Sequence, residues 1–277
     1  MISADLKDRR HHRIRMRAEL ADRLHWRRRA AKARLYCERK ALAIFGRRRT
    51  KPTGRLLCYH SVGQPDLGVN DCSPSRFRRQ IELALRQGYQ FVPAARIARG
   101  EAGPRDLSIT FDDGWRSTLM VAAPILSEYQ IPWTLFVATD FVDCPSDWHR
   151  TRMLTWDELG ELSRMGVEIG SHSVSHPDFG RIDEKTAVDE LQQSRSRLQS
   201  RLSLPIDSLA IPFGQSRNWS SFAHHAAQRA GYELIYAQAE NTRPPGTIPR
   251  TFVTSIDDDR IFAALLDGAF DNWEEWY

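Results

Sequence analysis

Apolar and polar positions along the chain follow two periods, one typical of short buried strands and the other of amphipathic helices. Short apolar or β-branched runs predict strands at 56–59, 91–92, 107–111, 133–138, 167–170, 208–211, 234–237 and 251–254. Helical spacing predicts helices near 75–87, 117–129, 155–166, 183–202, 220–230 and 258–266, and a Gly/Pro-rich loop separates the second and third strands. Because strands and helices alternate, we expect an α/β fold built from parallel β-α units.

The first 54 residues follow a different pattern. Apolar residues recur near helical spacing between the basic clusters Arg27–Arg29 and Arg47–Arg49, and Lys51-Pro-Thr-Gly54 interrupts this spacing. We therefore expect two parts. Residues 1–54 form a basic amphipathic or partly disordered N-terminal arm with a linker, and residues 55–277 form one domain that is long enough to bury a full core.

Charge is divided unevenly between these parts. Residues 1–51 hold 18 of the 40 Lys and Arg and 5 of the 35 Asp and Glu, a net charge of +13, and the remaining residues carry −8, which gives the formal total of +5. A basic amphipathic arm can bind an anionic membrane surface, nucleic acid or a partner helix, and a solvated arm is the simplest alternative. Among these we favour the membrane surface and do not expect nucleic acid.

Hydropathy and cysteine spacing bear on the location of the protein. No run of 18 apolar residues occurs, and the four cysteines lack the Cys-x-x-Cys spacing of a zinc or disulfide framework. We therefore expect a cytoplasmic protein whose basic arm can reach the inner face of the membrane.

Two polar motifs stand where predicted strands end. Leu107–Phe111 runs into Asp112-Asp113-Gly114, so two carboxylates lie at the C-terminal edge of a strand, where parallel α/β folds carry their sites. Neighbouring side chains of a strand point opposite ways, so one carboxylate can bind a metal while the other faces a water. The next motif, in the loop after 167–170, holds His172 and His176. Two imidazoles and one carboxylate suit zinc or a similar divalent ion and leave positions open for water.

These motifs carry a family resemblance. Thr110-Phe-Asp-Asp-Gly114 followed by His172-Ser-Val-Ser-His176 resembles the polysaccharide deacetylases, the NodB-homology group also called carbohydrate esterase family 4, and the resemblance runs from about Leu56 to Thr254. It implies a distorted (β/α) barrel. It also implies a divalent metal held by Asp113, His172 and His176. Asp112 would then be the general base for hydrolysis of an N-acetyl group on a sugar.

The sequence departs from the family pattern at two places. It lacks the C-terminal Leu-x-His motif that supplies the general acid in many members, but Tyr59-His60-Ser-Val62 resembles the arrangement of some biofilm-polysaccharide deacetylases, so His60 is our candidate for the acid. Ala210-Ile-Pro-Phe-Gly214 resembles the Arg-x-Pro-Tyr motif, but Ala210 replaces the arginine that orients the catalytic aspartate in the family. Arg250 is a candidate replacement, and the alternative is that Arg250 is an ordinary surface-loop arginine.

Together these features predict a metal-dependent hydrolase that removes N-acetyl groups from an N-acetylated polysaccharide or a lipid-linked sugar. Trp115, Trp148 and Phe213 could form an apolar wall for a sugar face or an acetyl methyl. Two alternatives stay open: a deformylase or other amide hydrolase on the same metal site, and a catalytically decayed glycan-binding or scaffolding protein. The missing arginine slightly favours decay, whereas the intact ligand set disfavours it more.

Overall fold

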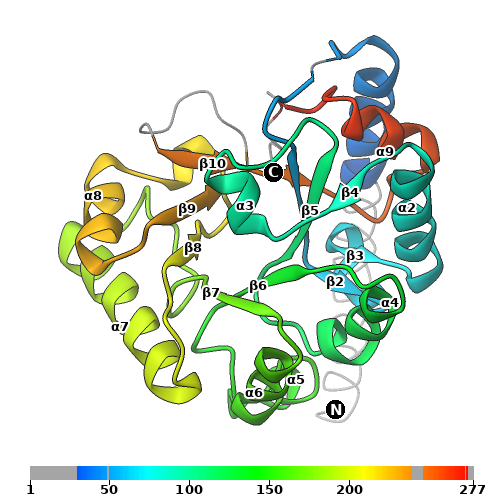
Figure 1. The fold of residues 1–277 in the computed structure, drawn as a ribbon. Coiled ribbons are helices and arrows are strands. Elements are labelled where there is room, and N and C mark those ends of the chain that lie inside the picture. The colour runs from blue at the N-terminus through cyan, green and yellow to red at the C-terminus, as the bar shows by residue number, and fades with distance from the viewer. Residues whose placement is uncertain (1–29, 49, 239–245, 272, 274–277) are drawn as a thin grey trace, which may run out of the picture.

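A parallel sheet that nearly closes on itself forms the centre of the molecule (Figure 1). The structure is a computed structural model of the 277-residue chain and describes residues 30–48, 50–238, 246–271 and 273. Around the sheet the strands follow the order β10 (Thr247–Pro249), β9 (Leu234–Ala237), β8 (Ser208–Ala210), β7 (Glu168–Ser171), β6 (Trp133–Val137), β5 (Asp106–Phe111), β1 (Arg55–Tyr59) and β11 (Thr251–Phe252). A short strand, β4 (Gln90–Phe91), also pairs with β5.

The closure of this sheet explains its barrel shape. Its two end strands, β10 and β11, are consecutive in the chain and are separated only by Arg250, yet β10 pairs with β9 and β11 pairs with β1. The backbone N–H of Arg250 donates to the carbonyl oxygens of Ala237 and Gln238, at 2.9 Å each. Arg250 therefore stands at the seam, and the predicted distorted (β/α) barrel is confirmed.

Strand side chains alternate between two apolar cores. Outward-facing residues such as Leu57 and Ile109 form the larger core under the helices. These outer helices are α2 (Pro74–Arg86), α4 (Ala123–Glu128), α6 (Trp156–Arg164), α7 (Glu184–Leu202), α8 (Ser221–Ala230) and α9 (Asp259–Leu266) (Figure 1). Inward-facing residues such as Leu56 and Leu234 form a smaller core with α3 (Ala94–Ala98). Since Leu56 and Leu234 lie near the starts of their strands, the opposite ends of the strands are left for the site.

Most predicted helices begin at the residue that their capping chemistry indicates. Thr155 and Glu158 form the complete capping box of α6, and the Asp183 side chain accepts from the N–H of Thr186 at the start of α7. The remaining short elements are β2 (Ser61–Val62), β3 (Asp71–Cys72), the 3-10 helices at Pro65–Asn70 and Ser216–Asn218, and α5 (Asp147–Arg150).

Two local predictions need correction. The loop expected after the second strand contains α3, because Pro93 precedes a run of good helix formers that begins at Ala94. The helix expected near 117–129 starts as a π-helical turn, Thr118–Ala122, in which the N–H of Ala123 donates to the carbonyl of Thr118. Pro124 has no N–H to donate to the preceding turn, and the α-helix continues only from Ala123.

The described part of the basic arm packs against the barrel domain. Residues 30–45 are helical, and Leu35, Arg39 and Ala43 are buried. The Arg39 guanidinium donates to both carboxylate oxygens of Asp257, at 2.5 and 2.6 Å, and to the carbonyl oxygen of Phe252. The amphipathic pattern predicted for residues 1–29 lies outside the described residues. Among the helices that the structure describes, none combines the length and apolarity needed to cross a membrane.

Candidate metal centre

The two carboxylates at the end of β5 diverge because the backbone turns between them. Asp112 continues the inward face of the strand, and its N–H donates to the carbonyl of Tyr59 on β1 at 3.1 Å. Asp113 has a φ of 73° and Gly114 a φ of 92°, so the chain leaves the extended conformation at this point. Asp tolerates this left-handed region better than most residues. The two side chains therefore make different contacts.

A buried ion pair holds Asp112. Arg250 donates from Nη1 to Oδ1 at 2.6 Å and from Nη2 to Oδ2 at 2.7 Å, and the Cys58 thiol lies 3.3 Å from Oδ2. The guanidinium also lies 5.2 Å from the centroid of the Phe136 ring inside the barrel. Burial, the largest single effect, raises the pKa of the Asp112 carboxyl, but the charge and hydrogen bonds of Arg250 together with the nearby histidines leave this pKa well below its usual range. Asp112 is thus an ionised carboxylate fixed in orientation.

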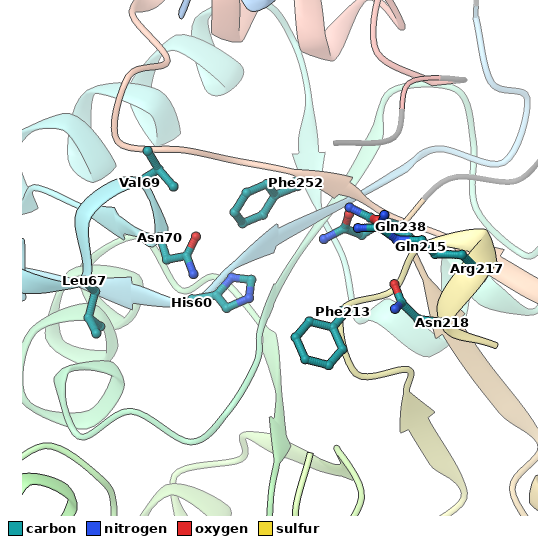
Figure 2. A pocket seen from close by; sticks show the side chains of 10 residues that line it. All are labelled: His60, Leu67, Val69, Asn70, Phe213, Gln215, Arg217, Asn218, Gln238 and Phe252. Carbon is teal, nitrogen blue, oxygen red and sulfur yellow. The ribbon is translucent and has the colours of Figure 1, made fainter. Parts of the chain in front are cut away.

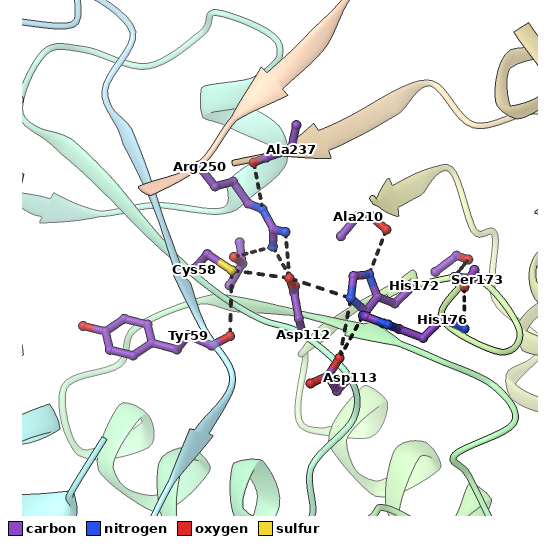
Figure 3. A network of polar contacts seen from close by, with 12 residues as sticks. Cys58, Tyr59, Asp112, Asp113, His172, Ser173, His176, Ala210, Ala237 and Arg250 are labelled. Carbon is purple, nitrogen blue, oxygen red and sulfur yellow. Dashed lines mark hydrogen bonds and ion pairs between the residues drawn. The ribbon is translucent and has the colours of Figure 1, made fainter. Parts of the chain in front are cut away.

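Asp113 gathers the two histidines of the following motif (Figure 3). Its Oδ1 atom lies 3.6 Å from Nε2 of His172 and 3.6 Å from Nε2 of His176. One ligand atom from each of the three residues lies within 4.8 Å of the others. Burial raises the pKa of the Asp113 carboxyl, and the nearby histidines, His60 foremost, lower it to a net value below the usual range.

The loop after β7 presents both imidazoles to this point. His172 donates from Nδ1 to the carbonyl oxygen of Ala210, at 2.8 Å, so its Nε2 atom is left to face Asp113. Burial lowers the pKa of His172 to about 4, and the ring is therefore neutral at pH 7. Glu190 of α7 accepts from the backbone N–H groups of Val174 and Ser175 and so anchors the loop.

This donor set fits a divalent ion. Two imidazole nitrogens and a carboxylate oxygen converge, and the remaining polar atoms of two of these ligands are already bound by the protein. His172 Nδ1 is bound to Ala210, and Asp113 Oδ2 accepts from Trp115 Nε1 at 2.8 Å. Such outer contacts fix the orientation of metal ligands. The arrangement offers the three protein ligands of a catalytic metal site, with Asp112 beside them.

His60 directly follows β1, on the same rim of the barrel. Its ring packs edge-on against Phe252, with centroids 5.1 Å apart, and its buried Nδ1 atom has no hydrogen-bond partner. It directly follows Tyr59, whose carbonyl oxygen accepts from the N–H of Asp112, and it lines the same pocket as Phe213, which packs against His176. The structure thus brings all six predicted site residues to one end of the barrel.

Several contacts of the site were missed in the sequence. Cys58 lies on β1, two residues before His60, so strand alternation could have placed both on one face. Trp115 was expected only as an apolar wall, yet its indole N–H binds Asp113. Trp148 packs edge-on against Trp115 at 5.7 Å, and Phe213 packs edge-on against His176 at 4.6 Å.

The chain is similar to known polysaccharide deacetylases. The family model for polysaccharide deacetylase matches residues 99–235, a range that includes both carboxylates and both histidines but neither His60 nor Arg250. The poly-beta-1,6-N-acetyl-D-glucosamine N-deacetylase of Staphylococcus aureus strain MSSA476 is 24% identical over 193 residues, which cover 65% of this chain and 66% of that protein. The Escherichia coli K12 protein of the same name is 31% identical over 114 residues, which cover 36% of this chain and 17% of that protein.

Solved structures share the fold. IcaB from Ammonifex degensii superposes with a TM-score of 0.65 at 20% identity, covering 79% of this chain and 98% of that one. The chain spans less than two thirds of the length of the curated relatives named above.

Proposed function

Because the chain belongs to the polysaccharide deacetylase family, whose model covers residues 99–235, we propose that it is a metal-dependent hydrolase that removes N-acetyl groups from an N-acetylated polysaccharide. One observation carries the proposal. Asp113, His172 and His176 converge within 4.8 Å, beside a second carboxylate that Arg250 keeps ionised. Decay of a catalytic site usually removes ligands first, so the presence of both the ligand cluster and this ion pair argues against a decayed site.

Asp113, His172 and His176 would hold the ion, and we propose zinc because it favours such nitrogen and oxygen ligands. When bound, a divalent ion lowers the pKa of water toward about 7 and polarises a carbonyl oxygen. Arg250 orients Asp112 through two hydrogen bonds, so the carboxylate is ready to accept a proton from the attacking water. Trp115 keeps Asp113 in place through its indole N–H.

His60 would complete the reaction from the end of β1. The leaving amine needs a proton, and an imidazole is the side chain best suited to give one near neutral pH. Asp112 and His60 come from different strands, so one can accept a proton from water while the other donates to the nitrogen.

The test is release of acetate from oligomers of β-1,6-linked N-acetyl-D-glucosamine, the sugar in the names of two relatives. We expect release that is lost with a chelator and restored by zinc. Parallel N-formylated oligomers distinguish a deformylase. A protein that binds metal but releases neither acid from any acylated glycan would instead be a decayed glycan-binding protein.

We also propose that residues 30–48 bind an anionic membrane surface, which would place the protein at the inner face of the membrane with access to lipid-linked sugars. Ile44 and Phe45 are 49% and 84% exposed near the end of the described helix, next to Arg47 and Arg48. Each cation near such a surface contributes about 1 kcal/mol. Sedimentation with anionic vesicles should fall when Ile44 and Phe45 are both changed to Ser and when salt is raised. Leu85→Ser, at an exposed apolar residue of α2, is the control, and equal binding by all variants would contradict the proposal.

A further inference from the structure

Two pockets lie toward opposite ends of the barrel strands. The pocket of His60, Phe213 and Phe252 adjoins the metal centre and belongs to that site (Figure 2). A second pocket, of about 250 Å³, lies where β1 and β5 begin, since Arg55 and Arg105 line it. At a rise of about 3.3 Å per residue, the strand covers about 16 Å from Arg55 to His60. A small ligand in this second pocket, the basal pocket, would therefore lie apart from the metal centre.

Basic side chains predominate on the walls of the basal pocket. Asp267 is the one acidic residue among the described residues that line it, whereas four are basic: Arg48, Lys51, Arg55 and Arg105. The Asp267 side chain is 53% exposed and its Oδ2 atom lies 3.9 Å from Nε of Arg48, so water screens this pair. The basic residues come from the linker, from the start of β1 and from the loop before β5. Because like charges brought together in this way repel one another, their convergence indicates a site for an anion.

Two of the guanidinium groups are oriented by uncharged parts of the protein. Arg105 lies over the ring of Tyr89, 5.1 Å from its centroid, and donates to a backbone carbonyl oxygen at 3.4 Å. Arg48 donates to the carbonyl oxygens of Ala43 and Gly46, at 2.7 and 3.2 Å. Since a guanidinium carries five N–H donors, both groups keep donors for a ligand.

A close backbone contact fixes the linker against the barrel. Gly54 has a φ of 83°, and its N–H donates to the carbonyl oxygen of Lys51 at 3.3 Å, so the linker turns there. A Cβ atom at this position would lie 2.5 Å from the carbonyl oxygen of Asp106, which only glycine avoids. Arg55 follows with a side chain that is 3% exposed and bonded to Asp271. The pocket is therefore a built site with a buried cation in its wall.

We propose that the basal pocket binds a phosphate group, either free phosphate or the phosphomonoester headgroup of a lipid. Guanidinium groups donate in pairs to phosphate oxygens. A phosphomonoester carries a charge of about −1.5 to −2 at pH 7, which suits several cations better than a single carboxylate does. The volume lies below the range of about 300–1,000 Å³ that is usual for drug-sized ligands, so it suits one small anion. Bound phosphate would join Lys51 of the linker to Arg105 of the barrel.

The test is calorimetric titration of the full-length protein with inorganic phosphate, near neutral pH and at constant ionic strength. We expect saturable binding by the wild type. Arg105→Gln and Lys51→Gln should each weaken it by about tenfold, the factor for one lost charge-assisted hydrogen bond. Arg164→Gln removes the same charge from an exposed arginine of α6 and should keep the wild-type affinity. Because the Arg105 side chain is exposed, Arg105→Gln should also unfold near the wild-type temperature.

Phosphate that bound at the metal centre would respond to a different variant. Asp113→Ala removes a proposed metal ligand and should keep the binding of phosphate in the basal pocket. If Asp113→Ala loses phosphate while Arg105→Gln and Lys51→Gln bind it like the wild type, the phosphate lies at the metal centre and the proposal is overturned. Acetate release enters none of these readouts, so the proposal and the proposed deacetylase activity fail independently.

Sedimentation with vesicles separates the two sources of phosphate. Phosphatidic acid in phosphatidylcholine presents a phosphomonoester, whereas phosphatidylglycerol at the same surface charge presents a phosphodiester. If Arg105→Gln loses a wild-type preference for phosphatidic acid, the ligand is a lipid headgroup; weaker phosphate titration with unchanged sedimentation identifies free phosphate. Equal binding of phosphate and of both vesicles by wild type, Arg105→Gln and Lys51→Gln overturns the proposal. The double variant Ile44→Ser with Phe45→Ser should still bind inorganic phosphate, so the pocket does not depend on the proposed membrane contact.

Discussion

Replacing Arg250 with Met should remove the ion-pair partner of the Asp112 carboxylate. Among the described residues, Arg250 is the only Arg or Lys that pairs with Asp112. The substitution keeps an aliphatic side chain over Phe136 and removes the charge. The side chains of Arg250 and Asp112 are 1% and 5% exposed, so the variant leaves a carboxylate buried without its counter-charge. Breaking a buried pair in this way typically costs about 3–5 kcal/mol of unfolding free energy.

The pH dependence of this loss follows from the pKa of Asp112. In the wild type the carboxyl has a pKa below its unfolded value, so the pair contributes stability above about pH 4 and loses it as pH falls further. Without Arg250, burial of the carboxylate is opposed less, so the folded pKa of Asp112 rises and the stability that the pair contributes above about pH 4 is lost. The difference between wild type and Arg250→Met should therefore be largest at neutral pH and shrink in acid.

Urea unfolding at several pH values and acetate release measure the two effects. Acetate release should fall by about 10²–10⁴-fold, the usual effect of losing a general base. The double variant Arg250→Met with Asp112→Asn should recover much of the stability and none of the activity, because no buried charge is left unpaired. Arg260→Met, at an exposed arginine of α9, is the control and should change stability by less than about 0.5 kcal/mol. An Arg250→Met protein with wild-type stability and turnover would refute the assigned role.

Three further variants test His60, Arg39 and Glu168. His60→Ala should lower amide turnover but leave metal content unchanged. The loss should be smaller for an activated ester, whose leaving group needs no proton, and equal losses for both substrates would exclude His60 as the acid. Arg39→Met should lower the unfolding free energy by about 3–5 kcal/mol in a urea titration, since it leaves Asp257 buried without its ion-pair partner; unchanged stability would show that the helix of residues 30–45 is not held by this pair. Glu168→Gln should raise the thermal midpoint of unfolding at pH 7 and not below pH 4. Burial raises the pKa of Glu168 in the folded state, so the wild type loses stability as pH rises above the unfolded pKa of this group. A midpoint gain that persists in acid would contradict this explanation.

The part of the site that could be predicted is local in sequence. Asp112 and Asp113 directly follow an apolar strand, and His172 and His176 lie four residues apart after another. Both strands are long enough for their apolar pattern to be recognised in the sequence. Parallel strands bring their C-terminal ends to one rim of the barrel. The predicted cluster therefore needed no knowledge of distant contacts.

The seam of the barrel could not be predicted with the same ease. β10 has three residues and β11 has two, too few to show a period. Arg250 meets Asp112 across 138 residues of sequence, and only the closure of the sheet brings them together.

In the proposed mechanism Asp113 holds the ion and Asp112 moves the proton. Metal content and acetate release, measured together on Asp112→Asn and Asp113→Ala purified in parallel, test it most directly. We expect that Asp112→Asn keeps stoichiometric metal and loses about 10²–10⁴-fold in rate, whereas Asp113→Ala loses both the metal and the activity. If both variants lose metal equally, or if Asp113→Ala keeps a full complement, the division of roles between the two carboxylates is wrong.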